Sequence, residues 1–442
     1  MVSRDKYQLN RIIVFIILVL ASCRPSEMEP TPSATASVTP PVTPVPSPTQ
    51  VIVTPQPDPT DKPIVKGKVS IWLDWTQDEL AVLATHLESF QEKFPEIQIS
   101  ISYFPPDQLY DRYVSAAEKG EEPTILFGPS EWTKELSQGG YLRDIHGRTT
   151  EEFLESIQPI AWEGVVRNPF ILGLPFSMEG IVLYRNEELI ADAPASLDDL
   201  VNSARTLEEE EQFGIVIDVG YLYSGAFLQT CGGEYLDPSG SLLLTVEAGQ
   251  CWLEILNLWR TAGFAIQNSD QDLQAFTSGQ TAWLIDGSWN APHILQALGA
   301  ETLAVDPWPT YTPTGKALAG YAWSRNIYFG VSSTDEDFDA AWILARYLLT
   351  PEVQTDFGES TYGLHVPVLL SVATVQPWLQ GLIRSIGSNI TVPQFPEFDI
   401  FSEELELAAY DVSRRDYDPY YAMLWVHGKI EKALRYANLE EE

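Results

Sequence analysis

A tryptophan at the junction between a predicted strand and a predicted helix is the first residue that points to ligand binding. Residues 275–289 read AFTSGQTAWLIDGSW and end in Trp289. The apolar run 281–285 predicts a buried strand, and Ser288 is suited to cap the following helix. Trp289 is therefore expected at the mouth of an α/β sheet, where such folds bind ligands. The alternative is that Trp289 is an ordinary core residue.

The sequence lacks the motifs of common enzyme and metal sites. It contains no nucleophile elbow around a serine, no phosphate-binding loop, no HExxH and no cysteine-rich metal spacing. Its five histidines are scattered without ligand spacing. We therefore expect no catalytic residues, no metal ion and no cofactor.

The elements that would position Trp289 alternate between strands and helices. Strands are predicted at 69–73, 97–103, 124–127, 215–219 and 321–331. Helices are predicted at 78–94, 107–119, 196–207, 221–230, 246–261, 337–349, 403–412 and 420–437. This alternation predicts parallel α/β sheets, and its restart after residue 184 predicts two similar lobes. Gly279 is expected in the left-handed position at a helix end, Asp286-Gly287 in a turn, and residues 390–400 in an irregular bridge.

Length and charge narrow the class of protein. The chain has 442 residues, more than one compact core usually holds, and 45% of them are apolar. The formal net charge is −36. Residues 1–64 carry five basic and five acidic side chains, so the imbalance lies on residues 65–442. Such a surface repels nucleic acid and anionic headgroups, and no nucleic-acid partner is expected.

The N-terminus predicts export and a lipid anchor. A basic segment with Arg4, Lys6 and Arg11 precedes the apolar run 12–20, which is too short to span a membrane. The sequence Leu-Ala-Ser-Cys ending at Cys23 resembles the bacterial lipobox, which implies cleavage after residue 22 and lipidation of Cys23. An ordinary signal peptide with a chance cysteine is the alternative. Residues 23–64 are rich in Pro, Thr and Ser and predict an extended tether.

Two further cysteines remain. In an exported protein, Cys231 and Cys251 form a disulfide candidate. Two buried thiols are the alternative.

Four segments together resemble the extracellular solute-binding proteins of bacterial ABC importers, in the maltose-type group (family 1). They are residues 276–289, residues 174–186 (LPFSMEGIVLYRN), Gly232-Gly233 and residues 340–353 (AAWILARYLLTPEV). The resemblance covers most of residues 68–438. It implies the two-lobed, periplasmic-binding-protein-like α/β fold (type II), in which each lobe is a mainly parallel sheet flanked by helices and hinge strands cross between the lobes. The implied N-terminal lobe is 65–177 with 324–376, and the C-terminal lobe is 178–323 with 377–442.

The resemblance also implies a carbohydrate site between the lobes. Trp289 would stack on a sugar ring and Glu179 would accept hydrogen bonds from hydroxyls. The other implied ligand-binding residues are Glu131, Trp132, Asp74, Trp75, Tyr221, Tyr223, Trp323 and Arg325. Flat aromatic rings and fixed carboxylates suit the C–H faces and hydroxyls of sugars. Arg325 could instead simply pair with an acid.

The implied function is capture of a mono- or oligosaccharide by lobe closure and its delivery to the transmembrane subunits of an ABC permease. The protein would be a non-enzymatic, monomeric lipoprotein on the outer face of the cell membrane. Two alternatives remain at this level. An exported glycoside hydrolase also uses paired carboxylates and aromatics, and a binding lipoprotein can serve sensing instead of transport.

Overall fold

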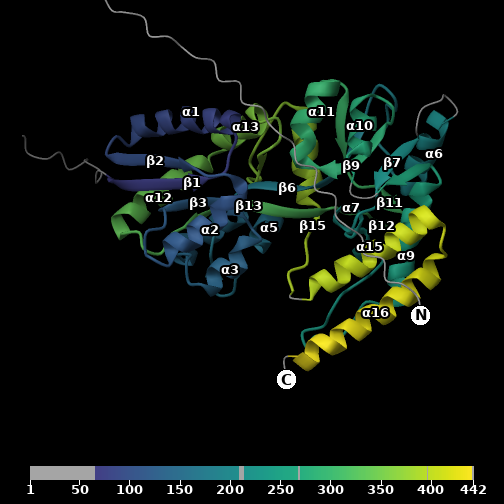
Figure 1. Ribbon diagram of the computed structural model, residues 1–442. Coiled ribbons are helices and arrows are strands. Elements are labelled where there is room, and N and C mark those ends of the chain that lie inside the picture. Colours follow the sequence, from purple (N-terminus) through teal and green to yellow (C-terminus); the bar gives the residue numbers. More distant parts are fainter. Residues whose placement is uncertain (1–64, 209–213, 267–268, 396, 441–442) are drawn as a thin grey trace, which may run out of the picture. The chain divides into compact units, whose positions relative to one another are not determined.

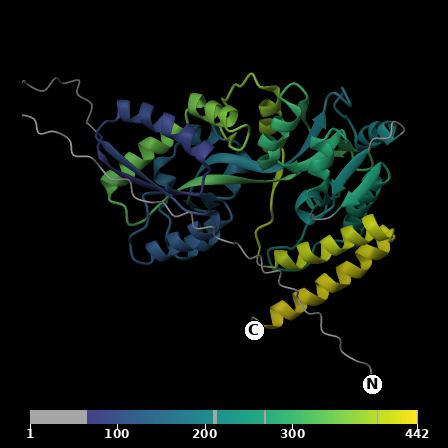
Figure 2. The ribbon, with the colours of Figure 1, turned by 45° about the horizontal axis from the view of Figure 1, so that its top comes forward.

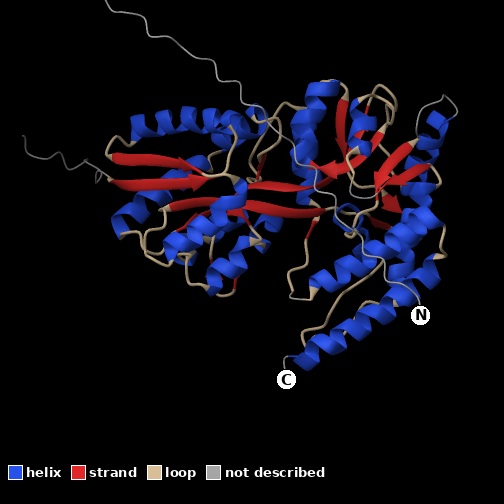
Figure 3. Cartoon of the chain, viewed as in Figure 1, coloured by secondary structure: helices blue, strands red, loops and turns tan. Residues whose placement is uncertain are grey.

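Strands and helices alternate through the described residues of the computed structural model, which are 65–208, 214–266, 269–395 and 397–440 (Figures 1 and 3). Residues 62–442 form one compact unit. The predicted signal peptide (1–22), the lipidated Cys23 and the tether (23–64) lie outside the described residues.

The first series of elements follows the predicted order closely. Its members are β1 (Gly67–Leu73), α1 (Gln77–Lys93), β2 (Ile97–Tyr103), α2 (Pro106–Ala117), β3 (Ile125–Pro129) and α3 (Trp132–Gln138). Helix α1 begins with a capping box, in which Thr76 accepts from the backbone of Glu79 and Glu79 accepts from the backbone of Thr76. This box fixes where the chain leaves β1, and therefore where Asp74 and Trp75 lie.

Short elements and one long strand then lead into the second series. They are η1 (His146–Arg148), α4 (Glu151–Glu155), α5 (Pro159–Glu163), β4 (Val166–Arg167), β5 (Phe170–Ile171) and β6 (Leu174–Asn186). The second series contains α6 (Leu197–Glu208), β7 (Ile215–Asp218), α7 (Tyr221–Ser224), α8 (Phe227–Thr230), α9 (Val246–Arg260), β8 (Gly263–Ile266), α10 (Gln271–Thr277), β9 (Trp283–Gly287), η2 (Ser288–Asn290) and α11 (Ala291–Leu298). The single helix predicted at 221–230 is wrong, because α7 and α8 are separate short helices.

The remaining elements return across the sheet and end in two helices. They are β10 (Leu303–Asp306), β11 (Thr310–Tyr311), β12 (Lys316–Ala317), β13 (Tyr321–Phe329), α12 (Asp335–Leu348), α13 (Pro351–Ser360), β14 (Val366–Pro367), α14 (Pro377–Gly387), β15 (Ile390–Thr391), α15 (Phe398–Arg415) and α16 (Pro419–Glu440). Helices α15 and α16 lie side by side at one edge of this unit (Figure 2). The irregular bridge predicted at 390–400 is shorter than expected, because α15 already begins at Phe398.

The largest sheet is built around the two long strands β6 and β13. Its order is β10-β6-β13-β3-β1-β2, with β9 and β14 also paired to β6 and β15 paired to β13. Parallel pairing occurs in β1–β2, β1–β3 and β13–β15, and in the separate pair β7–β8. Strand β6 is antiparallel to β13, β9 and β10. The two long strands therefore connect elements of both halves of the sheet (Figure 1).

Buried side chains form two large hydrophobic cores, one on each half. Strand β6 contributes to both, since Phe176 and Val182 lie in the first core and Ile181 and Leu183 in the second. Helices α11 and α14 pack in the first core, although the sequence assigned both to the C-terminal lobe. The exact lobe boundaries therefore stay a prediction.

In the second half, Cys231 and Cys251 are joined by a disulfide that links the end of α8 to α9. Trp252 and Trp259 of α9 are fully buried in the second core. The disulfide and the contacts of these indoles fasten α8 and α9 to the second core.

Candidate functional site

The register of the two long strands brings several predicted residues together. Strand β13 carries Trp323 and Arg325, and Trp323 pairs directly with Glu179 of the antiparallel strand β6. Asp74 follows the last residue of β1, which belongs to the same sheet. Residues far apart in the sequence therefore meet where β1 ends against the crossing strands.

An ion network joins these strands. One guanidinium nitrogen of Arg325, Nη2, lies 2.7 Å from Oδ1 of Asp74, and Nη1 lies 3.7 Å from Oε1 of Glu179. Burial alone lowers the pKa of Arg325, but the carboxylates of Glu179 and Asp74 outweigh it and raise that pKa above its ordinary value. The Nε atom of Arg325 is buried and has no hydrogen-bond partner among the described residues.

Two indoles lie beside this network. The ring centroids of Trp289 and Trp323 are 5.5 Å apart with an interplanar angle of 33°. The Nε1 of Trp323 donates to Oε2 of Glu179 at 2.9 Å. The ring of Trp289 lies over Gly287, where an added Cβ would come within 2.1 Å of it. Glycine at position 287 is thus needed for this position of the indole.

The chain reaches Trp289 by a route that differs from the prediction. Gly279 adopts the predicted left-handed conformation, with φ of 71°. Asp286 and Gly287 do not form a turn, because they are the last residues of β9. Ser288 does not cap a helix either, and its Oγ instead accepts from the backbone N–H of Gly180 at 3.2 Å. This bond ties the Trp289 segment to β6 beside Glu179.

Glu131 lies between β3 and α3, close to the network, and Trp132 is the first residue of α3. Glu131 is exposed to solvent on one side, but its surroundings desolvate the carboxyl group and raise its pKa. The Glu179 carboxylate also raises this pKa. A hydrogen bond from the backbone of Glu131 and the charge of Arg325 lower it. Trp132 packs against Tyr110, with ring centroids 5.3 Å apart, and its ring lies over Gly128. Glu131 is thus coupled to the site electrostatically, and the ligand role of Trp132 stays a prediction.

Trp75 does not face the site. It is 2% exposed and packs between Phe127 and His365, each with ring centroids 4.6 Å away. His365 in turn contacts the buried Glu79 at 2.7 Å. The prediction of Trp75 as a ligand-binding residue is wrong, because the surrounding aromatic side chains cover it.

Tyr221 is also covered, and Tyr223 is half-buried. The Tyr221 hydroxyl is hydrogen-bonded to that of Tyr235, which also bonds the hydroxyl of Tyr321 at 3.1 Å. Tyr221 is 4% exposed, so its predicted ligand role is wrong too. Burial raises the pKa of Tyr223 most, and the nearby Asp286 raises it further. Tyr223 therefore lies close to a group of aspartates.

Three residues next to the site were not predicted. A cavity of about 40 Å³ is lined by Glu131, Trp323, Glu163, Arg167 and Thr391, among others. The Thr391 hydroxyl donates to Glu163 at 2.8 Å. These residues come from α5, β4 and β15, which no motif in the sequence distinguishes. Trp289 is not among the residues that line this cavity.

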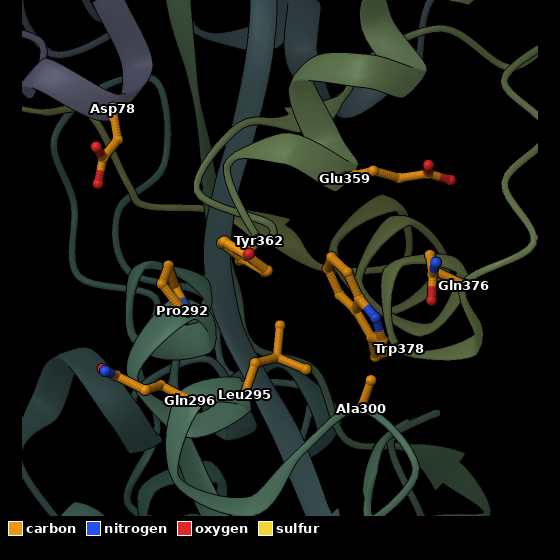
Figure 4. A pocket seen from close by; sticks show the side chains of 9 residues that line it. All are labelled: Asp78, Pro292, Leu295, Gln296, Ala300, Glu359, Tyr362, Gln376 and Trp378. Atoms are coloured by element: carbon orange, nitrogen blue, oxygen red, sulfur yellow. The ribbon is translucent and has the colours of Figure 1, made fainter. Parts of the chain in front are cut away.

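A larger cavity of about 630 Å³ lies elsewhere (Figure 4). Its lining consists of Asp78, Pro292, Leu295, Gln296, Ala300, Glu359, Tyr362, Gln376 and Trp378. It shares no residue with the predicted ligand site. Trp378 is 3% exposed, so it presents little of its ring to this space. Size alone does not make this cavity the site, because the ion network and the paired indoles lie outside it.

Carboxyl groups gather in the second half of the chain, at the ends of β7 and β9 and at the start of α10. Burial raises the pKa of Asp272 to about 7 and that of Asp286 to about 6, and Asp218 adds to both effects. Asp286 accepts from Asn290 Nδ2 at 2.7 Å, which partly opposes its shift.

These two carboxyls predict a pH-dependent stability. Between about pH 4 and pH 7 the folded state holds protons that the unfolded state releases, so the free energy of unfolding should fall as pH rises. We expect Asp272→Asn to flatten this fall, which for Asp272 amounts to at most ~4 kcal/mol. Urea unfolding at several pH values measures the free energy of unfolding, and Asp192→Asn, at an exposed position, is the control. An unchanged pH dependence in Asp272→Asn would contradict the assignment.

No helix among the described residues has the length and apolar character to cross a membrane. The same residues contain no group of three or more His, Cys, Asp or Glu side chains placed to hold a metal ion.

The fold is that of two-lobed ligand-binding proteins whose structures are known. It is similar to the extracellular solute-binding protein from Staphylococcus aureus in complex with maltose, with a TM-score of 0.70 and 18% identity, covering 85% of this chain and 99% of that one. Residues 86–381 match the family described as bacterial extracellular solute-binding protein. The chain therefore belongs to the bacterial extracellular solute-binding proteins.

Curated relatives are similar to the chain over long stretches. The maltotriose-binding protein of Pyrococcus abyssi is 24% identical over 351 residues, which are 75% of this chain and 74% of that protein. The maltooligosaccharide ABC transporter solute-binding lipoprotein of Streptococcus pneumoniae serotype 4 is 23% identical over 226 residues, or 46% of this chain and 51% of that protein.

Proposed function

We propose that this solute-binding protein captures a mono- or oligosaccharide and delivers it to the transmembrane subunits of an ABC importer. The observation that carries the proposal is the group formed by Trp289, Trp323, Glu179 and Arg325, where indole rings adjoin an ion network on the two crossing strands. Indoles suit the C–H faces of sugars, and charged groups make strong hydrogen bonds to hydroxyls. The names of the relatives support a saccharide ligand.

The proposed mechanism is a shift between two conformations. Strands β6 and β13 connect both halves of the sheet, so a rotation about them would change the space around Glu179 and Arg325. A saccharide that contacts both halves stabilises the closed form by those additional contacts.

We further propose that Cys23 carries the lipid, that residues 23–64 tether the binding unit to the outer face of the membrane, and that the protein works as a monomer. The lipoprotein relative in Streptococcus pneumoniae supports the anchor. Transport and sensing both use such an arrangement, and transport is the role named for that relative.

We propose binding without hydrolysis, and one test separates the two. The raised pKa of Glu131 beside Glu179 is a feature that glycosidases also use. We expect saccharides from a panel of mono-, di- and oligosaccharides to raise the melting temperature, since a ligand at 100 times its Kd adds about 2.7 kcal/mol. Chromatography of the same samples should find the saccharide intact. Product release would make the protein an enzyme, and the absence of any shift across the panel would exclude carbohydrate capture.

A further inference from the structure

The cavity of about 630 Å³ is walled by residues from four helices and is separate from the proposed saccharide site (Figure 4). Asp78 lies in the first turn of α1, and Glu359 lies near the end of α13. Gln296 belongs to α11, and Gln376 directly precedes α14. The volume is within the range of small-molecule sites. The cavity is therefore large enough for a ligand of its own.

Tyr362, which follows α13, has a backbone conformation that its residue type disfavours. Its φ is 54°, in the left-handed region. The backbone N–H of Tyr362 donates to the carbonyl oxygen of Glu359 at 3.1 Å. The backbone N–H of Gly363 donates to the carbonyl oxygen of Gly358 at 2.8 Å. These two bonds form a Schellman motif, and the position that Tyr362 holds in this motif is usually glycine because a Cβ is crowded there.

The side chain of Tyr362 does not compensate for this conformation by burial. It is 58% exposed, and its hydroxyl has no hydrogen-bond partner among the described residues. Figure 4 shows the side chain at the cavity, between Asp78 and Glu359. Disfavoured backbone conformations that packing does not offset cluster at functional sites. Tyr362 therefore indicates that the cavity holds a ligand.

The charges of the cavity indicate the chemistry of that ligand. Asp78 and Glu359 are carboxylates, and no basic side chain among the described residues lines the cavity. Asp78 has no ion pair or hydrogen bond within the described part of the chain. Glu359 accepts a hydrogen bond from the hydroxyl of Thr374 and has no cationic partner there. An anion would be repelled by both carboxylates, whereas an amine cation would form charge-assisted hydrogen bonds with them.

The space between the two carboxylates has an apolar side. Pro292 and Leu295 of α11 line it beside Tyr362 (Figure 4). The side-chain amides of Gln296 and Gln376 have no hydrogen-bond partner among the described residues, so their oxygens can accept from an N–H group. Methylene groups that separate two ammonium groups would contact the apolar side chains, as the stems of lysine side chains do on protein surfaces.

We propose that this cavity binds a linear aliphatic polyamine, for which spermidine is the probe. The ammonium groups pair with Asp78 and Glu359, and the ring of Tyr362 attracts the cation through its π face. The methylene chain lies against Leu295. This site is distinct from the proposed saccharide site and does not depend on carbohydrate capture.

Calorimetric titration of the unaltered protein with spermidine tests the proposal. We expect saturable binding at one site, weaker binding of the shorter diamine putrescine, and no binding of the uncharged 1,4-butanediol. Tyr362→Gly is the critical variant, because glycine is favoured at this position of the Schellman motif. It should bind spermidine about tenfold more weakly and yet melt at a higher temperature than the unaltered protein. Neither measurement uses a saccharide.

Non-specific attraction is the main alternative, because the chain carries a net charge of −36. Asp78→Asn should weaken spermidine binding about tenfold. Asp192→Asn removes the same charge at an exposed position outside the cavity and should leave the affinity unchanged. Equal weakening by these two variants would show attraction to the overall charge and would overturn the proposal.

Three further outcomes would also contradict a polyamine site. They are the absence of saturable spermidine binding, unchanged spermidine affinity in Tyr362→Gly, and a lower melting temperature of that variant. The last result would mean that the Tyr362 ring stabilises the fold and that its conformation needs no ligand to account for it.

Discussion

Trp289→Ala is expected to lose at least ~30-fold in affinity for the saccharide while the protein stays folded. The variant removes the ring that lies over Gly287 and leaves Trp323 without the indole that it contacts. The ion network on β6 and β13 does not depend on this side chain, so the fold should persist. Calorimetric titration measures the affinity, and far-ultraviolet circular dichroism checks the fold.

The matched control for this variant is Trp425→Ala. Trp425 is 56% exposed on α16 and takes no part in the site, so its removal should leave the affinity unchanged. Binding of full strength by Trp289→Ala would show that the saccharide stacks elsewhere, and would remove the main support for the proposed site.

Arg325→Met is expected to lower the free energy of unfolding by about 3–5 kcal/mol and to weaken saccharide binding. Arg325 is the cation that lies between Asp74 and Glu179, whose side chains are 11% and 14% exposed. Without it, two poorly hydrated carboxylates would remain close together with no opposite charge. Urea unfolding measures the loss.

Two further variants make this test specific. Arg435→Met breaks a pair on the surface of α16, where Arg435 is 73% exposed, and should change stability by less than ~1 kcal/mol. Combining Arg325→Met with Asp74→Asn removes one of the stranded charges and should restore part of the loss. A loss in Arg325→Met no larger than in Arg435→Met would mean that the network contributes little to stability.

The two pairs of neighbouring candidates show where prediction from sequence ends. Asp74 and Trp75 both follow β1, and residue type suits either of them to a sugar site. Adjacent residues after a strand point to opposite sides. In the structure Asp74 contacts Arg325, and Trp75 packs in the aromatic core. The positions of β13 and Phe127 decide which of the two residues faces the site.

The same limit applies to Tyr221 and Tyr223. A helix was expected there, but its phase relative to the second core could not be known in advance. Tyr221 is buried against Tyr235, while Tyr223 stays half-buried near Asp286. Burial depends on which elements pack against α7, and these come from distant parts of the chain.

By itself, the sequence determined the alternation of strands and helices, the family, the pairing candidates Cys231 and Cys251, and Trp289 as the leading site residue. These follow from local periodicity, from turn residues and from motifs of contiguous residues. The tertiary structure alone decided that Trp289 contacts Trp323, that Glu179 receives the indole N–H, and that Arg325 joins Asp74 to Glu179. Each of these contacts depends on strand register and on the meeting of segments tens to hundreds of residues apart, which no local pattern specifies.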